Sequence, residues 1–306
     1  MARRRKGRDI SGWLVLDKPS GLGSTPALAR AKYLFEARKA GHAGTLDPLA
    51  SGILPIAFGE ATKTVSMMMD AEKEYECTIE WGVATNTDDS EGVETARSDH
   101  RPSLDDVWAV LPEFIGKIMQ VPPAFSAIHK DGERAYKLAR RGETPELDAR
   151  QVRIDNIEVM DSASPERISL KVSCGKGTYI RAIARDLGLR LGTFGHISML
   201  RRTRVGVFSL NNAIGLEKLG HLGHIAADLI ELDCLLLPLE TVLDDIPALA
   251  LSEEQARMVR HGRSIPVASL PSTPIAWAGY QSRAIALGEI VEGLFRPGRI
   301  INQPLD

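Results

Sequence analysis

Alternation of apolar and polar residues predicts the strands of this protein. Over residues 74–83 every second position is apolar: Tyr75, Cys77, Ile79, Trp81 and Val83. The segment 168–174 alternates in the same way. A period of two is typical of a strand with one buried face, so both segments are predicted strands. The short apolar run 13–17 and the segment 201–210 are predicted to form two more.

Capping residues and helical spacing predict the helices. Thr25 and Pro26 form a cap and a first helical position, and Gly41 is expected to end the helix that follows. Residues 103–106 resemble a capping box that opens an amphipathic helix. A third helix is expected from about residue 179 to 191. Helices mixed with alternating strands, without a regular βαβα order, favour an α+β fold over a doubly wound sheet.

Changes in composition along the chain predict its organisation. Residues 1–10 form a basic arm that is expected to be disordered, and residues 121–151, rich in proline, glycine and charge, are predicted to be an exposed insertion. Proline and acidic residues over 238–247 mark a boundary. A short helix near 252–261 and apolar runs separated by glycine and proline follow it, and this pattern suits a small β-rich module.

Overall composition excludes several classes of protein. A length of 306 residues, 43% apolar and 25% charged, is typical of a globular protein of one large domain with a smaller one, or of two comparable domains. The apolar stretches are too short to span a membrane, and the basic N-terminus lacks the features of a secretory signal. Three widely spaced cysteines suit neither a disulfide framework nor a metal site, as expected of a cytoplasmic protein.

The net charge of −2 conceals two blocks of opposite sign. Residues 176–204 contain seven Lys and Arg against one acid, whereas residues 228–254 contain eight acids and no Lys or Arg. A basic block of this kind presents a candidate face for a polyanion such as RNA, or else a solvated helix and strand edge.

A glycine-rich segment, residues 41–52, carries the most distinctive chemistry. Glycines let the backbone approach a ligand closely, and the proline after Asp47 holds that aspartate extended and fixes the direction of its carboxylate. By itself the segment also fits a turn in which Asp47 is only a cap. Its spacing does not match a phosphate-binding P-loop.

Two further segments have residue types suited to a ligand. In residues 175–188, a glycine pair precedes Tyr179 and Arg181 in the first turn of the predicted helix. The alternative is a partly buried tyrosine beside a solvated arginine. Residues 121–142 interleave basic, aromatic and glycine residues as a loop that grips an RNA backbone would, although charge-rich loops are common.

Taken in order and spacing, these segments resemble the TruB-type family of tRNA pseudouridine synthases. The resemblance covers about residues 12–210, and residues 250–306 are more weakly similar to the PUA-like tail of that family. Its motifs are Asp17-Lys18-Pro19, the Asp47 segment, Tyr75, the Thr85-x-Thr87-x-Asp89 stretch, Pro122-Pro123-x-x-Ser126-Ala127, Arg134-Ala-Tyr-x-x-Ala-Arg140, the Tyr179 segment and Leu200-Arg201-Arg202. Gly23 stands where the family more often has a hydroxyl residue, and His129 where it usually has lysine.

The family implies a fold and an activity. The fold is a catalytic domain over residues 11–245, with a mixed or antiparallel sheet flanked by helices and an RNA-gripping insertion at about 121–151, followed by a PUA-like RNA-binding domain over 246–306. The activity is isomerisation of uridine to pseudouridine at position 55, in the T-arm loop of tRNA, by a bacterial, cytoplasmic enzyme. The enzyme is expected to act as a monomer without metal or cofactor.

The resemblance also implies roles for individual residues. Asp47 is the catalytic carboxylate, Arg181 pairs with it, and Tyr179 is a general base or a hydrogen-bond partner of the substrate. Tyr75, which alternation alone would place in the core, stacks on the uracil, and Leu200 closes the other side of the pocket. The remaining substrate-binding candidates are His42, which would fill the stack left by the flipped base, Asp89, and the phosphate contacts Lys18, Arg134, Arg140, Arg201 and Arg202.

Alternatives remain at this point. A non-catalytic protein that binds and remodels tRNA would use the same basic face, and a synthase with another RNA target would share the motifs. Whether Asp47 attacks the sugar, adds to the base or acts through a glycal stays open.

Overall fold

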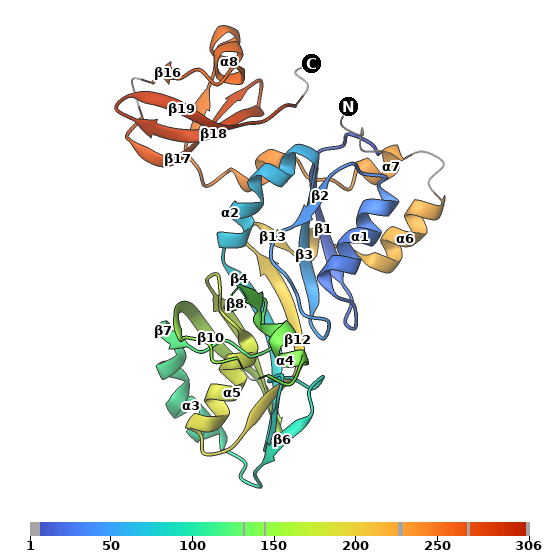
Figure 1. The fold of residues 1–306 in the computed structure, drawn as a ribbon, viewed down its shortest axis with the longest axis vertical. Coiled ribbons are helices and arrows are strands. Elements are labelled where there is room, and N and C mark those ends of the chain that lie inside the picture. Colours follow the sequence, from blue (N-terminus) through green and yellow to red (C-terminus); the bar gives the residue numbers. More distant parts are fainter. Residues whose placement is uncertain (1–6, 131, 144, 226–228, 268–269, 304–306) are drawn as a thin grey trace.

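A bent ten-stranded sheet forms the larger part of the molecule (Figure 1). The computed structural model describes residues 7–130, 132–143, 145–225, 229–267 and 270–303. In spatial order the strands are β14 (Ile214–Gly215), β1 (Gly12–Lys18), β3 (Ser51–Phe58), β12 (Gly195–Val205), β4 (Lys73–Trp81), β11 (Arg167–Cys174), β10 (Arg150–Ser164) and β7 (Gly116–Gln120). β2 (Ala40–His42) pairs with β3, and β13 (Phe208–Ser209) pairs with β12.

The long strand β12 joins the two halves of this sheet. It runs antiparallel to β4 and, at residues 201–202, parallel to β3. The strands β14, β1 and β3 form an N-terminal lobe, and β4, β11, β10 and β7 form a central lobe. The sheet is therefore mixed, and the predicted α+β class is confirmed. Any ligand that lies where β3 and β4 meet β12 contacts both lobes.

Helices cover each lobe separately (Figure 1). The N-terminal lobe carries α1 (Ser24–Leu34), α6 (Leu216–Ile225) and α7 (Ile230–Asp233), and the central lobe carries α3 (Leu104–Val110) and α5 (Ile180–Arg190). The 3₁₀ helix η1 (Gly59–Thr64) and α2 (Val65–Asp70) connect the lobes, and α4 (Ala135–Arg140) lies in the insertion. Shorter elements are β5 (Val83–Thr85), β6 (Glu94–Arg97), β8 (His129–Lys130), β9 (Glu133–Arg134) and the 3₁₀ helices η2 (Leu111–Phe114), η3 (Leu210–Asn212) and η4 (Leu239–Val242).

Several sequence predictions are confirmed in detail. The alternating segment 74–83 forms β4 as far as Trp81, with Cys77, Ile79 and Trp81 buried, whereas Val83 begins β5. Ser103 and Asp106 form the predicted capping box at the start of α3. Periodicity and capping succeed here because both depend on residues close together in the chain.

The predicted limits of the first helix are wrong. α1 begins at Ser24, with Gly23 as an N-cap that has no side chain to accept a hydrogen bond, and it ends at Leu34, well before Gly41. Glu36 adopts a left-handed backbone with φ of 49° and turns the chain away. The predicted strand 201–210 likewise starts earlier, at Gly195, and ends at Val205.

The N-terminal arm is ordered where the structure describes it. Arg8 forms an ion pair with Asp233, and its backbone bonds to Glu36 and Arg38. The prediction of disorder is therefore wrong for residues 7–10, whereas residues 1–6 lie outside the described residues.

A second, five-stranded sheet forms the C-terminal module (residues 248–303). Its strands, in spatial order, are β15 (Ala248–Ala250), β17 (Thr273–Tyr280), β18 (Arg283–Val291), β19 (Leu294–Ile300) and β16 (Ile265–Pro266), and α8 (Glu253–Arg260) packs on them. Ser252 and Gln255 form a capping box at the start of α8. The predicted β-rich module with its short helix is confirmed.

The strand β1 is buried on both faces and links the two sheets. Leu14 and Leu16 face the core beneath α1, and Trp13 and Val15 face a second apolar cluster that includes Ala284 and Ile301 of the C-terminal module, among others. Polar contacts add to this junction, because the Glu240 carboxylate accepts the Ala284 amide at 2.7 Å and the Lys63 ammonium donates to the Ile300 carbonyl at 2.7 Å. Across the described residues, no helix is long and apolar enough to cross a membrane.

The close contact between β3 and β12 can be tested by a substitution at Gly52. Its φ is 97°, and a Cβ there would lie 2.2 Å from the Arg202 carbonyl oxygen. We expect Gly52→Ala to lower the free energy of unfolding by about 3 kcal/mol. The new Cβ would overlap the Arg202 carbonyl oxygen, and the backbone conformation at this position is unfavourable for alanine. The matched control is Gly116, which has φ of 96° and open space around it. Gly116→Ala should cost only about 1–2 kcal/mol in urea unfolding, and equal losses would contradict the role of the contact.

Candidate active site

A cavity of about 570 Å³ lies where the two lobes of the large sheet meet. It is lined by the loop at residues 44–47, by β4, by β12 and by the N-terminal end of α5. Five of the predicted catalytic and base-contacting residues open on it: Asp47, Tyr75, Tyr179, Arg181 and Leu200. A second cavity of about 570 Å³ lies between the linker at residues 233–240 and the C-terminal module, and none of the predicted site residues lines it.

Strand register places Tyr75 and Leu200 on one face. In the β4–β12 pair, Tyr75 lies opposite Arg202 and Cys77 lies opposite Leu200. Paired residues of neighbouring strands share a face of the sheet, so Tyr75, Leu200 and Arg202 all point towards the cavity. Leu200 is buried, and Tyr75 is half-buried, since its side chain packs against the core and also lines the cavity.

The Asp47 loop (residues 43–50) is held by side chains from three distant segments. The Ser24 hydroxyl donates to the Leu46 carbonyl at 2.8 Å and accepts the Leu46 amide at 2.7 Å. The Arg202 guanidinium donates to the carbonyls of Gly44 at 3.0 Å and Thr45 at 3.5 Å. The Lys18 ammonium reaches the Pro48 carbonyl at 3.5 Å. These contacts fix the loop, so the Asp47 carboxylate is exposed to the cavity without being mobile.

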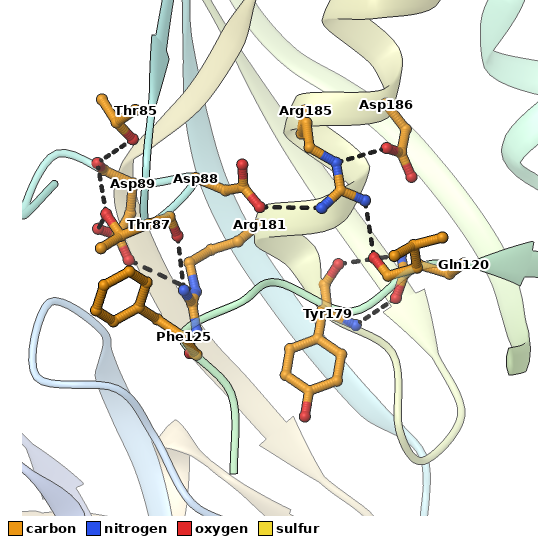
Figure 2. Close-up of polar contacts among 11 residues, drawn as sticks. Thr85, Thr87, Asp88, Asp89, Gln120, Phe125, Tyr179, Arg181, Arg185 and Asp186 are labelled. Atoms are coloured by element: carbon orange, nitrogen blue, oxygen red, sulfur yellow. Dashed lines mark hydrogen bonds and ion pairs between the residues drawn. The ribbon is translucent and has the colours of Figure 1, made fainter. Parts of the chain in front are cut away.

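Arg181 is buried and fully engaged (Figure 2). Its Nη2 lies 2.8 Å from the Asp47 carboxylate and donates to the Phe125 carbonyl at 2.9 Å. Its Nη1 donates to the Thr87 carbonyl at 2.7 Å, and its Nε lies 3.5 Å from the Asp89 carboxylate. The solvated arginine considered as an alternative is therefore wrong. A buried guanidinium that contacts two carboxylates fixes the direction of the Asp47 side chain.

Asp89 occupies the far side of Arg181 from the cavity. Its side chain is 4% exposed, accepts the Thr87 hydroxyl at 2.6 Å and accepts the Glu91 amide at 3.1 Å. It does not line the cavity. All its described contacts are internal, and its charge is directed at Arg181, so the role of Asp89 in substrate binding stays a prediction.

Tyr179 is the N-cap residue of α5, and Gln120 holds it in place (Figure 2). The Gln120 side-chain amide donates to the Tyr179 carbonyl at 3.1 Å, and its oxygen accepts the Tyr179 amide at 2.8 Å. Burial raises the pKa of the Tyr179 phenol, and the guanidinium of Arg150 opposes that effect. At neutral pH the phenol therefore keeps its proton.

Arg185 ties the root of the insertion to α5 and to the loop after β5 (Figure 2). It forms ion pairs with Asp88 at 3.1 Å and Asp186 at 2.8 Å, and it donates to the Val121 carbonyl at 2.8 Å. Burial raises the pKa of Asp88, and Arg185 opposes that shift. The predicted helix correctly includes Arg185, but its contact with the insertion was not predicted.

The predicted phosphate contacts divide into two groups. Lys18 and Arg202 are buried, and their charged groups donate to backbone carbonyls of the Asp47 loop and its neighbours, so they are not surface phosphate contacts. Arg201 is half-buried and paired with Asp17 at 2.7 Å. Arg134 is exposed, and Arg140 lies over the Tyr136 ring at 5.5 Å.

His42 lies in β2, outside the cavity lining. Its Nδ1 is buried and has no hydrogen-bond partner among the described residues. Burial lowers the pKa of His42, and the nearby Arg202 adds to that effect. The ring is therefore neutral at physiological pH, a form suited to stacking.

Sequence reasoning missed Gln120, Ser126 and Arg150 as parts of this site. Ser126 and Arg150 line the cavity, and Gln120 clamps Tyr179. A signal existed, since Ser126 belongs to a recognised motif and Arg150 closes the predicted insertion. No group of three or more potential metal-ligating residues occurs within the described part of the chain.

Known structures share the fold. A structure titled as a Cbf5-Nop10-Gar1 complex superimposes with a TM-score of 0.73 at 25% identity, covering 95% of this chain and 84% of that chain. An H/ACA RNP bound to a substrate RNA containing 2'-deoxyuridine gives a TM-score of 0.74 at 22% identity, covering 99% and 92%. That second likeness concerns the fold alone.

Comparisons with protein families and with relatives of similar sequence show the family of this chain. Residues 32–180 match the family described as TruB family pseudouridylate synthase (N terminal domain), and residues 181–244 match the tRNA pseudouridylate synthase B C-terminal domain. The class is therefore pseudouridylate synthase. tRNA pseudouridine synthase B of Caulobacter vibrioides is 51% identical, covering 98% of this chain and 99% of that protein, and the Rhizobium meliloti protein of the same name is 50% identical, covering 97% of each. The chain belongs to the TruB family.

Lys18 provides a test of its structural role. Its ammonium donates to the carbonyls of Pro19, Leu22 and Pro48. We expect Lys18→Met to lower the free energy of unfolding by about 1–3 kcal/mol, because these carbonyls lose a charged donor. The slope of log Kd for tRNA against log salt concentration should stay unchanged, whereas Arg134→Gln, which removes an exposed charge, should reduce it by about one. A reduced slope for Lys18→Met would contradict its structural role.

The effect of Lys18→Met on the free energy of unfolding should also depend on pH. Burial holds the pKa of Lys18 at about 8, below its ordinary value of 10.5. Between these values the unfolded chain binds more protons than the folded chain, so the contribution of Lys18 to stability rises with pH. Wild type should therefore gain stability relative to Lys18→Met between pH 8 and 10 in urea unfolding, and a constant difference would be inconsistent with a buried ammonium.

Proposed function

We propose that this protein isomerises uridine to pseudouridine in tRNA, at position 55 in the T-arm loop. The observation that carries the proposal is a fixed, cavity-facing carboxylate, that of Asp47, paired at 2.8 Å with the buried guanidinium of Arg181. Membership of the TruB family and full-length relatives that carry the name tRNA pseudouridine synthase B support the reaction and the substrate.

The reaction needs a carboxylate and no redox step. The bond between N1 of uracil and C1′ of ribose breaks, the base turns, and C5 bonds to C1′, while C5 loses a proton and N1 gains one. Asp47 can attack C1′, add to the base or remove a ribose proton to form a glycal. Each of these routes requires an ionised carboxylate of fixed direction, as in retaining glycosidases. The ion pair with Arg181 fixes that direction.

The rest of the cavity suits a flipped uracil. Tyr75 offers a ring for stacking, worth about 1–3 kcal/mol for a base, and Leu200 provides an apolar wall that keeps water away. Tyr179 retains its proton, which favours a hydrogen-bonding role towards the substrate over that of a resting base. His42 is the residue proposed to fill the stack after the base leaves it.

RNA contacts outside the cavity are assigned to three arginines. Arg134 and Arg140 of the insertion, which are exposed, are proposed to contact phosphates, together with Arg201 of β12, which is half-buried and paired with Asp17. Residues 11–245 are proposed to act as the catalytic domain and residues 246–306 as a PUA-like RNA-binding domain. We propose a monomer that works in the cytoplasm, where its tRNA substrate is made.

A protein that binds and remodels tRNA without chemistry is the second candidate. It would use the same basic insertion. It would have no use for a buried Arg181 directed at a carboxylate in a cavity, and for that reason the enzymatic function is favoured.

Release of the hydrogen from C5 of uracil tests the proposal. With tRNA tritiated at uridine C5, wild type should release tritium into water, and Asp47→Asn should reduce the rate at least about a thousandfold, as removal of an essential nucleophile does. Binding of tRNA should persist. Asp155→Asn, which removes a carboxylate paired with Arg153 at 3.1 Å outside the cavity, is the control and should keep wild-type turnover. Binding without tritium release by wild type would instead establish the remodelling function.

A further inference from the structure

Arg150 is an unpaired cation in the wall of the cavity. Five basic residues line this space, and four of them are engaged within the protein: Lys73, Lys176, Arg181 and Arg202. Lys176 pairs with Asp70 at 2.9 Å, and Lys73 donates to the carbonyls of Met69 and Ala71. The Arg150 side chain has no hydrogen-bond or ion-pair partner among the described residues. Its donors are therefore free to bind an anionic ligand that enters the cavity.

Ser126 adds a second polar group on the same cavity. Ser126 is 4% exposed, and apart from the Tyr179 phenol, whose pKa it lowers through a hydrogen bond, its hydroxyl has no hydrogen-bond partner among the described residues. A hydroxyl can make more than one hydrogen bond, so Ser126 keeps capacity for a ligand beside Tyr179.

Strand register places Arg150 close to Tyr179. Arg150 opens β10 and pairs in register with Gln120 of β7, the residue that clamps the Tyr179 backbone. Arg150 is also the charged group that most strongly opposes the effect of burial on Tyr179. Arg150 and Ser126 therefore flank Tyr179, one at each root of the insertion.

We propose that Arg150, assisted by the Ser126 hydroxyl, binds the phosphate group adjacent to the flipped uridine. The inference rests on the proposed function, because the ligand is a nucleotide of the RNA. A guanidinium offers two parallel N–H donors that match phosphate oxygens, and a hydroxyl supplies a third donor. The phosphate neutralises a charge that the protein leaves unpaired. It is thereby held between the two ends of the insertion, while the base reaches Asp47.

Replacement of that phosphate tests the proposal directly. T-arm stem-loops are made with a neutral methylphosphonate either 5′ or 3′ of the target uridine, and tritium release is measured for each with wild type and Arg150→Gln. On the native stem-loop we expect Arg150→Gln to reduce kcat/KM roughly 10- to 100-fold, the worth of a charged hydrogen bond. On the methylphosphonate substrate at the contacted position the two enzymes should differ less than about twofold.

Further variants distinguish a direct phosphate contact of Arg150 from a structural role of this residue. Arg150→Lys should restore part of the rate on the native stem-loop, and Ser126→Ala should lose less than Arg150→Gln. The control is Arg153→Gln on the same strand, because Arg153 is exposed and already paired with Glu72 at 3.0 Å and Asp155 at 3.1 Å. It should leave kcat/KM unchanged.

Two results would overturn the proposal. One is an equal loss for Arg150→Gln on the native and on both methylphosphonate substrates, which would mean a structural role. The other is no loss on the native stem-loop. A failure of the proposed function is distinct, since wild type would then release no tritium from the native substrate.

Discussion

Burial of the Arg181 guanidinium is the constraint on which this site depends. A charge removed from water must be matched by nearby anions and acceptors, and three separate segments of the chain supply them: Asp47, Thr87 with Asp89, and Phe125. Each segment is thereby fixed relative to α5. The exposed end of this arrangement is the Asp47 carboxylate, so the interactions that satisfy a buried charge also set the position of the candidate catalytic carboxylate.

Two further buried cations are satisfied by hydrogen bonds to the backbone. Lys18 and Arg202 donate to carbonyl oxygens of the Asp47 loop and of the turn beside it, and Gly52 lets the Arg202 backbone approach closely. A glycine-rich loop would otherwise sample many conformations. Lys18 of β1 and Arg202 of β12 therefore restrict the conformations that the loop can adopt. The insertion, in contrast, is tied mainly at its root by Arg181 and Arg185, and much of it remains exposed.

The sequence predicted features that depend on near neighbours, and it was weaker for those that depend on distant ones. Alternation identified β4, and the Ser103–Asp106 capping box identified α3. The motif resemblance gathered Asp47, Tyr75 and Leu200 correctly around one cavity. The same resemblance implied that Lys18 and Arg202 contact phosphates, yet both are buried and donate to backbone carbonyls. Arg202 and its partner Gly44 lie 158 positions apart in the chain, so this contact has no local signal. Glu36 likewise turns the chain without a glycine.

The apolar junction between β1 and the C-terminal module has a geometric consequence. Trp13 and Ala284, both fully buried, belong to one continuous cluster, so the module is packed against the sheet and not merely tethered to it. The distance between the candidate active-site cavity and the module is then a property of the core. For an RNA that touched both, the target nucleotide and the second contact would lie at one set spacing along its helix. Helix length in base pairs would then enter recognition independently of nucleotide sequence.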